Sequence, residues 1–199
     1  MLDKSIISKC INGDRKAQET LYNFYSSQMK GVCMRYARSS FEAEDLFQDA
    51  FIKIFKNLQN YKGEGSFDGW VRRIVINTSI DYYKKRMTQG DTVNYDDVNE
   101  NDIDSKIELV NEIDLEVLIK LLNELPNGYR MVLNLYAIEG YSHKEIAEML
   151  EVSESTSKSQ LIKARKYFKS LLQKNRINEN GTRAFWYRWS FKETSLLPR

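Results

Sequence analysis

The 199-residue chain has few of the residues that interrupt helices or bind metals. It contains two prolines, two cysteines and a single histidine, His143. Proline breaks helices because it lacks a backbone donor, so its scarcity favours long helical segments. Cys10 and Cys33 form no Cys-x-x-Cys pair, and with one histidine they cannot make a structural zinc site. We therefore expect reduced cysteines, no metal and no cofactor.

Long hydrophobic runs are also absent from the sequence. No stretch reaches the roughly 18 apolar residues that a membrane-spanning helix requires. The first residues, MLDKSIISKC, have no apolar core of the kind found in signal peptides. The sequence therefore predicts a cytoplasmic protein with no membrane span.

The charges, which nearly cancel over the whole chain, are unevenly distributed along it. Residues 1–86 carry 15 Lys and Arg against 10 Asp and Glu, a balance of +5. Residues 87–125 carry 2 against 11, a balance of −9, and residues 126–199 carry 13 against 7, a balance of +6. Basic blocks attract phosphate backbones, but they also serve solubility alone. Charge does not separate these two interpretations.

Apolar residues at helical spacing predict an all-α chain of two small helical domains. In the first domain we expect a helix of about two dozen residues capped by Asp14, a helix over 41–58, and a helix after Ser66. The glycine-containing NYKGEGS separates the last two. In the second domain we expect helices over 107–125 and 127–138, then two more within HKEIAEMLEVSESTSKSQLIKARK. Residues 87–105 are too polar to fold alone and predict a flexible acidic linker.

The last two helices have the pattern of a helix-turn-helix. The chain must turn between Leu150 and Ser153, where Val152 supplies an apolar contact and Ser153 can cap the next helix. Leu161, Ala164 and Phe168 are expected in the core. The opposite face, which suits a DNA groove, carries Ser155, Lys158, Ser159, Lys163 and Lys166. A surface pair of helices with one basic face is the alternative.

The first domain has two further polar faces. Arg73, Asn77, Asp81 and Lys84 share one face of an otherwise apolar helix, which suits unpaired bases. Alternatively, Asp81 and Lys85 form an i,i+4 ion pair on a solvated face.

A second face, on the helix over 41–58, carries Glu42, Asp45 and Asp49 beside Leu46 and Gln48. The default interpretation of this face is a solvated surface, and the next is a docking surface for a basic partner. A Mg²⁺ nuclease site is least favoured, because no third carboxylate motif supports it.

Taken in order, four segments resemble bacterial RNA polymerase sigma factors of the extracytoplasmic-function (ECF) group of the sigma-70 family. They are AEDLFQDAFIKIFKNLQNY, GSFDGWVRRIVINTSIDYYKKR, LPNGYRMVLNLYAIEGYSHKEIAEML and VSESTSKSQLIKARKYF, with the acidic linker after the second. The resemblance covers roughly residues 10–172. It implies a non-enzymatic subunit that binds core RNA polymerase through the β′ clamp and β flap and directs promoter-specific initiation.

The resemblance also implies boundaries and residue roles. Residues 1–87 correspond to sigma region 2, 88–106 to the linker, and 107–175 to the region 4 helix-turn-helix; 176–199 form a tail of unknown role. The polymerase-docking residues would be Asp45, Leu46, Gln48 and Asp49, with Phe51 in the docking stretch or in the core. Residues for recognition and melting of the −10 element would be Tyr61, Lys62, Phe67, Arg72, Arg73, Asn77, Asp81 and Lys85. Residues reading the −35 element would be Ser155, Thr156, Lys158, Ser159, Gln160, Lys163 and Arg165.

Three positions depart from the family pattern. Ser157 replaces a small aliphatic residue, and Gln160 replaces an arginine, which predicts a preference for adenine over guanine. Glu151 occupies a turn position often taken by glycine and is tolerated there if its φ is negative. The aromatic tail NGTRAFWYRWSFKETSLLPR lies beyond the resemblance and is expected to be poorly ordered, or else to bind a partner or membrane surface.

The resemblance implies promoter DNA and core polymerase as partners, admits an anti-sigma factor, and implies no small-molecule substrate. A stand-alone helix-turn-helix regulator is the alternative function, and a carboxylate-dependent nuclease is a weaker one. The sigma factor and the stand-alone regulator differ in one testable respect. A regulator binds specific duplexes alone, whereas a sigma factor becomes specific only with core polymerase.

Overall fold

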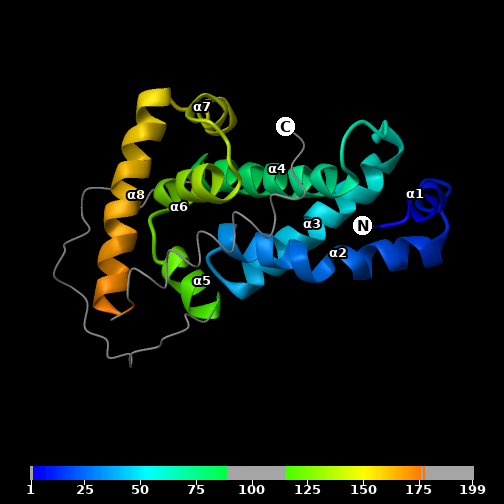
Figure 1. Cartoon of the computed structure of the whole chain (residues 1–199), viewed down its shortest axis with the longest axis horizontal. Helices are drawn as coiled ribbons and strands as arrows, with labels where there is room; N and C mark the ends of the chain where they lie inside the picture. The colour runs from blue at the N-terminus through cyan, green and yellow to red at the C-terminus, as the bar shows by residue number, and fades with distance from the viewer. Residues whose placement is uncertain (1, 89–114, 176, 178–199) are drawn as a thin grey trace. The chain divides into compact units, whose positions relative to one another are not determined.

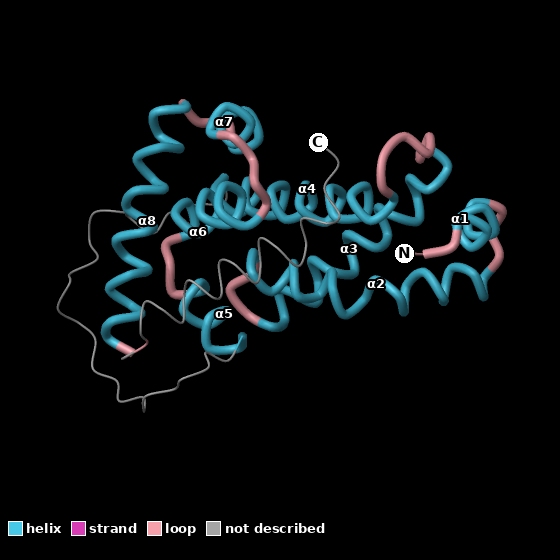
Figure 2. The backbone as a smooth tube through the Cα atoms, viewed as in Figure 1, coloured by secondary structure: helices cyan, strands magenta, loops and turns pink. Residues whose placement is uncertain are grey.

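The computed structural model describes residues 2–88, 115–175 and 177. Within these ranges every regular element is a helix and no strand is present (Figure 2). The all-α prediction is therefore confirmed. The tail apart from Ile177, most of the predicted linker and the start of the helix expected over 107–125 lie outside the described residues. The linker was expected from Met87 onward, but Met87 and Thr88 still belong to a helix.

The chain divides into two units, with the boundary between Tyr82 and Tyr83. The first unit contains α1 (Lys4–Ile11), α2 (Arg15–Tyr36), α3 (Ser40–Asn57), the short η1 (Leu58–Asn60) and most of α4 (Phe67–Thr88) (Figure 1). The predicted caps are present, because Asp14 accepts from the Ala17 backbone N–H (3.0 Å) and Ser66 from that of Gly69 (3.2 Å). These side chains satisfy donors that have no partner inside the helix.

Helix α1 was not predicted. Its eight residues are too few to give a clear periodic pattern, and an isolated helix of this length is not stable in water. In the folded chain Asp3 caps the helix by accepting from the Ser5 N–H (2.9 Å), and Ile7 and Cys10 are buried. Packing against α2, rather than intrinsic propensity, therefore explains this helix.

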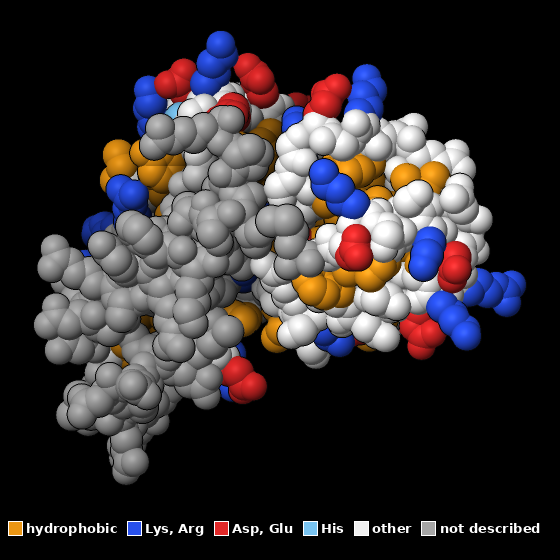
Figure 3. All heavy atoms as spheres, turned by 45° about the vertical axis from the view of Figure 1, so that its right-hand side comes forward, with side chains coloured by type: hydrophobic (Ala, Val, Ile, Leu, Met, Phe, Trp, Pro, Cys, Tyr) orange, Lys and Arg blue, Asp and Glu red, His pale blue; other side chains and the backbone are white. Residues whose placement is uncertain are grey.

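The core of the first unit is formed by apolar faces of α2, α3 and α4. Leu21, Tyr25 and Val32 from α2 are fully buried, as are Ile54 of α3 and Val75 of α4. Both cysteines of the chain are free and buried here, and burial raises the pKa of the Cys33 thiol to about 12. Some hydrophobic side chains remain visible among scattered charges on the face of this unit shown in Figure 3.

The second unit contains α5 (Leu115–Asn123), α6 (Asn127–Leu133), η2 (Asn134–Ile138), α7 (His143–Leu150) and α8 (Glu154–Lys174). The helix predicted over 127–138 is not uniform, because α6 passes into a π-helical segment, η2. The Glu139 N–H bonds the Asn134 carbonyl (3.0 Å), five residues back, as a π-helix requires. Gly140, with φ of 79°, ends the segment.

The helix-turn-helix is formed by α7, a short turn and α8. Ser142 and Glu145 make a capping box at the start of α7, and Ser153 caps α8 by accepting from the Thr156 N–H (3.0 Å). The predicted core residues of α8 are buried, with Leu161 at 4%, Ala164 at 0% and Phe168 at 3% exposure. The two helices therefore pack as the apolar spacing predicts.

The condition of a negative φ, under which a glutamate is readily tolerated at position 151, is not met. Its φ is 57°, in the left-handed region that favours glycine. This conformation ends α7 and reverses the chain, so that the Val152 N–H can bond the Ala147 carbonyl (3.1 Å). The tight connection between the two helices imposes the strained backbone.

No helix among the described residues is both long and apolar enough to cross a membrane.

Candidate functional site

A groove of about 450 Å³ lies in the first unit, between the end of α3 and the outer face of α4. Seven of its nine lining residues are polar or charged, and the other two are an indole and an isoleucine. The lining residues are Lys53, Asn57, Asn60, Trp70, Arg73, Ile74, Asn77, Thr78 and Asp81. The groove thus collects the outward face of α4 that the sequence marks as polar.

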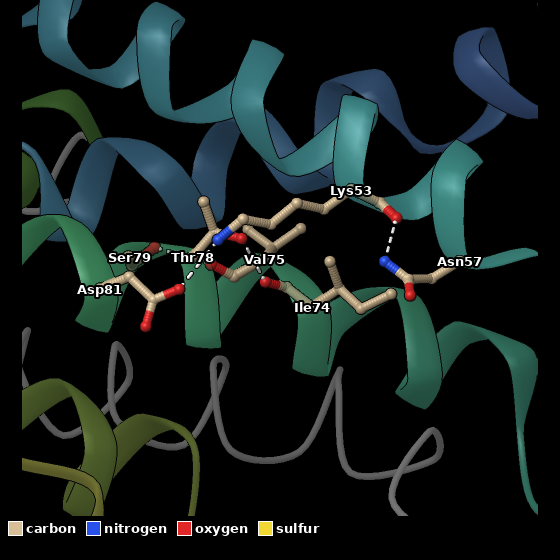
Figure 4. Close-up of polar contacts among 7 residues, drawn as sticks. All are labelled: Lys53, Asn57, Ile74, Val75, Thr78, Ser79 and Asp81. Carbon is tan, nitrogen blue, oxygen red and sulfur yellow. Dashed lines mark hydrogen bonds and ion pairs between the residues drawn. The ribbon is translucent and has the colours of Figure 1, made fainter. Parts of the chain in front are cut away.

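The register of α4 places these polar side chains outward. Thr78 and Ser79 are buried, and their hydroxyls donate to the carbonyls of Ile74 (2.8 Å) and Val75 (2.9 Å) four residues back (Figure 4). Both hydroxyls are therefore satisfied by their own helix. Arg73, Asn77 and Asp81, in contrast, are exposed.

Asp81 forms an ion pair across the groove rather than the i,i+4 pair that the sequence offers as an alternative. The Lys53 ammonium donates to the Asp81 carboxylate at 2.8 Å, and Figure 4 shows Lys53 reaching from α3 to α4. The backbone carbonyl of Lys53 also accepts from the Asn57 amide (2.8 Å). Both charged groups of the pair are largely exposed, so it contributes at most about 1 kcal/mol to stability.

An aromatic cluster borders the groove at the start of α4. The Tyr61 ring packs on Phe67 (5.0 Å between centroids) and on Trp70 (5.5 Å), and its hydroxyl donates to the Gly65 carbonyl (3.0 Å). Tyr61 and Trp70 are half-buried, and Lys62 is exposed on the adjoining loop. The half-buried rings leave π-surface available for a planar ligand.

Two residues expected at the −10 surface lie inside the unit instead. Phe67 is 8% exposed and Arg72 is 9% exposed, whereas Lys85 is exposed. Phe67 stacks on Trp70 at 5.5 Å and so supports the aromatic cluster from within. Helical periodicity puts Arg73 but not Arg72 on the outward face, and Arg72 was expected at the −10 surface only through the resemblance.

The acidic face of α3 is exposed apart from half-buried Glu42 and buried Leu46. Asp45, Gln48 and Asp49 point to solvent, whereas Leu46 is 1% exposed and belongs to the core. Phe51, which the sequence left between docking and core, is also buried at 3% exposure. Among the described residues no group of three or more His, Cys, Asp or Glu side chains has the arrangement of a metal site.

In the second unit, α8 presents the residues expected to read the −35 element. Ser155, Lys158, Ser159, Lys163 and Arg165 are exposed. Thr156 and Gln160 are half-buried at the edge of this face. The Thr156 hydroxyl also takes part in the cap, with its oxygen 2.7 Å from that of Ser153. The face is polar and basic. Hydrogen bonds within the first turn of α8 hold its short hydroxyl side chains close to the backbone.

Two family models match the chain, one for each unit. Sigma-70 region 2 matches residues 21–88, and Sigma-70, region 4 matches residues 115–167. The ECF RNA polymerase sigma-E factor of Haemophilus influenzae is 26% identical over 183 residues, which cover 87% of this chain and 96% of that protein. The RNA polymerase sigma-H factor of Pseudomonas aeruginosa is 28% identical, over 86% of this chain and 94% of that protein.

The chain belongs to the ECF group of the sigma-70 family. It is a sigma factor, and members of this family direct transcription initiation. The fold agrees with a solved relative, the sigma factor RpoE in complex with the anti-sigma factor NepR from Bartonella quintana. That structure matches with a TM-score of 0.50 and 22% identity, over 78% of this chain and 96% of that one.

Several groove residues of this sigma factor were not predicted from its sequence. Lys53, Asn57 and Trp70 line the groove beside the predicted Arg73 and Asn77. Lys53 and Asn57 come from α3, whose periodicity indicates only which residues are buried. Their spacing of four residues on the polar side of α3 is a signal, but it does not say which other helix they face.

A small ring stack in the helix-turn-helix unit was not predicted either. Tyr136 of η2 stacks on His143 of α7 (4.5 Å between centroids), and the Arg165 guanidinium lies 5.7 Å from the Tyr136 ring centre. His143 Nδ1 is 2.9 Å from the hydroxyl oxygen of Ser157, which is fully buried. Ser157, the departure from the family's aliphatic residue, therefore has a polar partner on the facing helix.

Proposed function

We propose that this sigma factor works without catalysis of its own, with each unit binding a different part of a promoter and α3 binding core RNA polymerase. In bacteria, promoter DNA and core polymerase are in the cytoplasm, so a chain that binds them would be cytoplasmic as well. The observation that carries the proposal is the groove in the first unit, because its chemistry suits unpaired bases. Arg73, Asn77 and Asp81 offer donors and acceptors for base edges, and Trp70 offers a ring for stacking.

The first unit would open and hold the −10 element. A base taken out of a duplex loses its stacking and pairing, so a protein must offer substitutes for both. Tyr61 and Trp70 supply ring surface, Asn77 supplies an amide, and Lys62 and Lys85 supply positive charge for the backbone. Phe67 and Arg72, both buried, would support this surface from beneath.

The acidic face of α3 would bind the β′ clamp of core polymerase through Asp45, Gln48 and Asp49. These side chains are exposed, and Leu46 beneath them anchors the helix in the core. Carboxylates on a partner-binding face favour a basic partner surface and speed its association. The solved complex of RpoE with NepR supports adding an anti-sigma factor to the partners proposed for this chain.

The second unit would place α8 in the major groove of the −35 element. Lys158, Lys163 and Arg165 are positioned for phosphates or base edges, and Ser155 and Ser159 are short enough to let the helix approach closely. Residues 88–106, proposed as the linker between domains 1–87 and 107–175, and the tail 176–199 lie almost entirely outside the described residues.

The substitution Asn77→Ala tests the proposal at its central observation. We expect promoter opening to fall about tenfold, because one base-edge contact in this setting is worth about 1–3 kcal/mol. Opening is measured as permanganate reactivity of unpaired thymines near the start site, on promoters selected with wild-type holoenzyme. Association with core polymerase, measured by size-exclusion chromatography, should not change.

Asn23→Ala is the matched control, since Asn23 is exposed on α2 and does not line the groove. It should open promoters like the wild type. Unchanged opening by the Asn77→Ala holoenzyme would contradict the assignment of the α4 face.

A further inference from the structure

One side chain on the proposed −35 face is apolar, although a surface that binds only phosphates needs polar or charged groups. Ile162 lies in the middle of α8 and is 70% exposed. Its neighbours on either side in the chain, Leu161 and Lys163, are buried and exposed respectively, so α8 uses Leu161 and not Ile162 for its core. Ile162 therefore makes no contribution to packing that would explain an apolar residue at this position.

The residues around Ile162 make it the most prominent apolar group on that face. Ser155, Ser159, Ile162 and Lys166 follow one another at spacings of four, three and four residues and form a single exposed stripe. The Ser159 hydroxyl turns back to donate to the Thr156 carbonyl (3.0 Å), and the Ser155 and Ser153 hydroxyl oxygens are 2.8 Å apart. Both serines are short and held close to the backbone, so the branched side chain of Ile162 projects beyond them.

Cations lie along both edges of this stripe, with Lys163 on one side and Lys158 and Arg165, seven residues apart, on the other. Lys158 pairs with Glu154 one turn earlier on α8 (2.6 Å), and the Arg165 guanidinium lies 5.7 Å from the Tyr136 ring centre. Isolated exposed isoleucines are common on proteins and need no functional explanation. Here, however, the isoleucine is centred on the face that the proposed function puts against bases.

The major groove of DNA offers one large apolar group, the C5-methyl group of thymine. We propose that Ile162 contacts the methyl group of a thymine in the −35 element and thereby selects a T·A pair at that position. This assignment rests on the proposed function of α8 and adds a specificity residue to it. The serines permit the close approach, the flanking cations bind the backbone, and Ile162 supplies the apolar contact.

Replacing thymine by deoxyuridine tests the contact, since the exchange removes the methyl group and leaves the base-pairing edge intact. The probes are promoter duplexes selected from a randomised −35 library by wild-type holoenzyme, with each −35 thymine exchanged singly for deoxyuridine. For wild-type holoenzyme, we expect one exchange to weaken binding about fourfold, the value for losing one buried methyl or methylene group. For Ile162→Ala holoenzyme, we expect the same exchange to change binding less than about twofold.

Ile162→Val is the matched variant, because valine keeps a branched apolar group at the site and should retain part of the thymine preference. Thermal unfolding of both variants should match the wild type, since the side chain is exposed. Equal deoxyuridine effects in wild type and Ile162→Ala would overturn the assignment. A selected −35 element without a deoxyuridine-sensitive thymine would overturn it too.

Failure of the proposed function would look different. In that case the holoenzyme would bind selected and scrambled −35 duplexes equally, and no specificity would remain for Ile162 to explain. If specific binding survives while the deoxyuridine effect is absent, only the role of Ile162 fails.

Discussion

At the scale of single residues, a buried hydrogen bond joins α2 to the start of α4. Tyr25 is fully buried and its hydroxyl donates to the carboxylate of Asp68, which is 8% exposed. Burial, together with the Asp68 carboxylate, raises the pKa of Tyr25 far above its ordinary value, so Tyr25 remains a donor throughout the physiological range. The bond fixes the first turn of α4, from which Phe67 and Trp70 extend toward Tyr61.

Tyr25→Phe should destabilise the protein by about 1–3 kcal/mol, because it removes the hydroxyl that donates to a buried carboxylate. The measurement is the free energy of unfolding by urea. Tyr22→Phe removes a hydroxyl from a more exposed ring of the same helix and should change stability by less than about 0.5 kcal/mol. Equal effects of the two substitutions would mean that the Tyr25–Asp68 bond contributes little.

At the scale of elements, the connection between α7 and α8 sets the angle at which α8 is presented. Three features act together there: the left-handed Glu151, the cap at Ser153 and the contact of His143 with buried Ser157. A left-handed residue other than glycine costs roughly 1–2 kcal/mol. The fold tolerates this cost because the turn brings the apolar faces of both helices together.

Both Glu151→Gly and Glu151→Ala remove the carboxylate, so the difference between the two variants reports the backbone effect alone. We expect the glycine variant to be more stable than the alanine variant by about 1 kcal/mol, since glycine adopts a φ near 57° without strain. Thermal or urea unfolding measures the difference. An alanine variant as stable as the glycine variant would indicate that residue 151 has a negative φ in solution.

At the scale of the whole molecule, two basic segments are separated by an acidic one. Residues 1–86 and 126–199 have balances of +5 and +6, and residues 87–125 a balance of −9. The basic balances are small for a protein that binds DNA alone, because non-specific affinity rises with the number of phosphates neutralised. We therefore expect specific binding by the two small units to require a partner that holds them at promoter spacing.

The purified chain should bind selected promoter DNA weakly and prefer it to scrambled DNA by less than about twofold, whereas with core polymerase the preference should exceed about tenfold. Fluorescence anisotropy at one fixed salt concentration measures both, with core polymerase alone as the control. Equal selectivity of the free chain would instead favour a stand-alone helix-turn-helix regulator.

Much of the fold could be predicted from sequence because apolar periodicity and capping residues are local signals. Asp14, Ser66 and Ser153 mark helix starts that the structure confirms. Helix α1 and the π-helical η2 were not predicted, since neither follows from local preference. Both depend on contacts with other elements: α1 with α2, and η2 with α6 and α7.

The candidate sites were only partly predictable for the same reason. Periodicity placed Arg73, Asn77 and Asp81 on one outward face, but Lys53 and Asn57 reach the same groove from α3. Periodicity also did not show that Leu46, Phe67 and Arg72 are buried. A polar face is a property of one helix, whereas a groove requires two.

The sequence by itself determined that this protein is all-helical, that it has two helical domains and that it resembles the sigma-70 family, because short-range spacing and motif order carry that information. Only the tertiary structure decided that Asp81 pairs with Lys53 across a groove, that Glu151 has a positive φ and that Ile162 stands exposed on α8. These features arise when helices pack. Which side chains meet, and which stay in water, then depends on residues far apart in the chain.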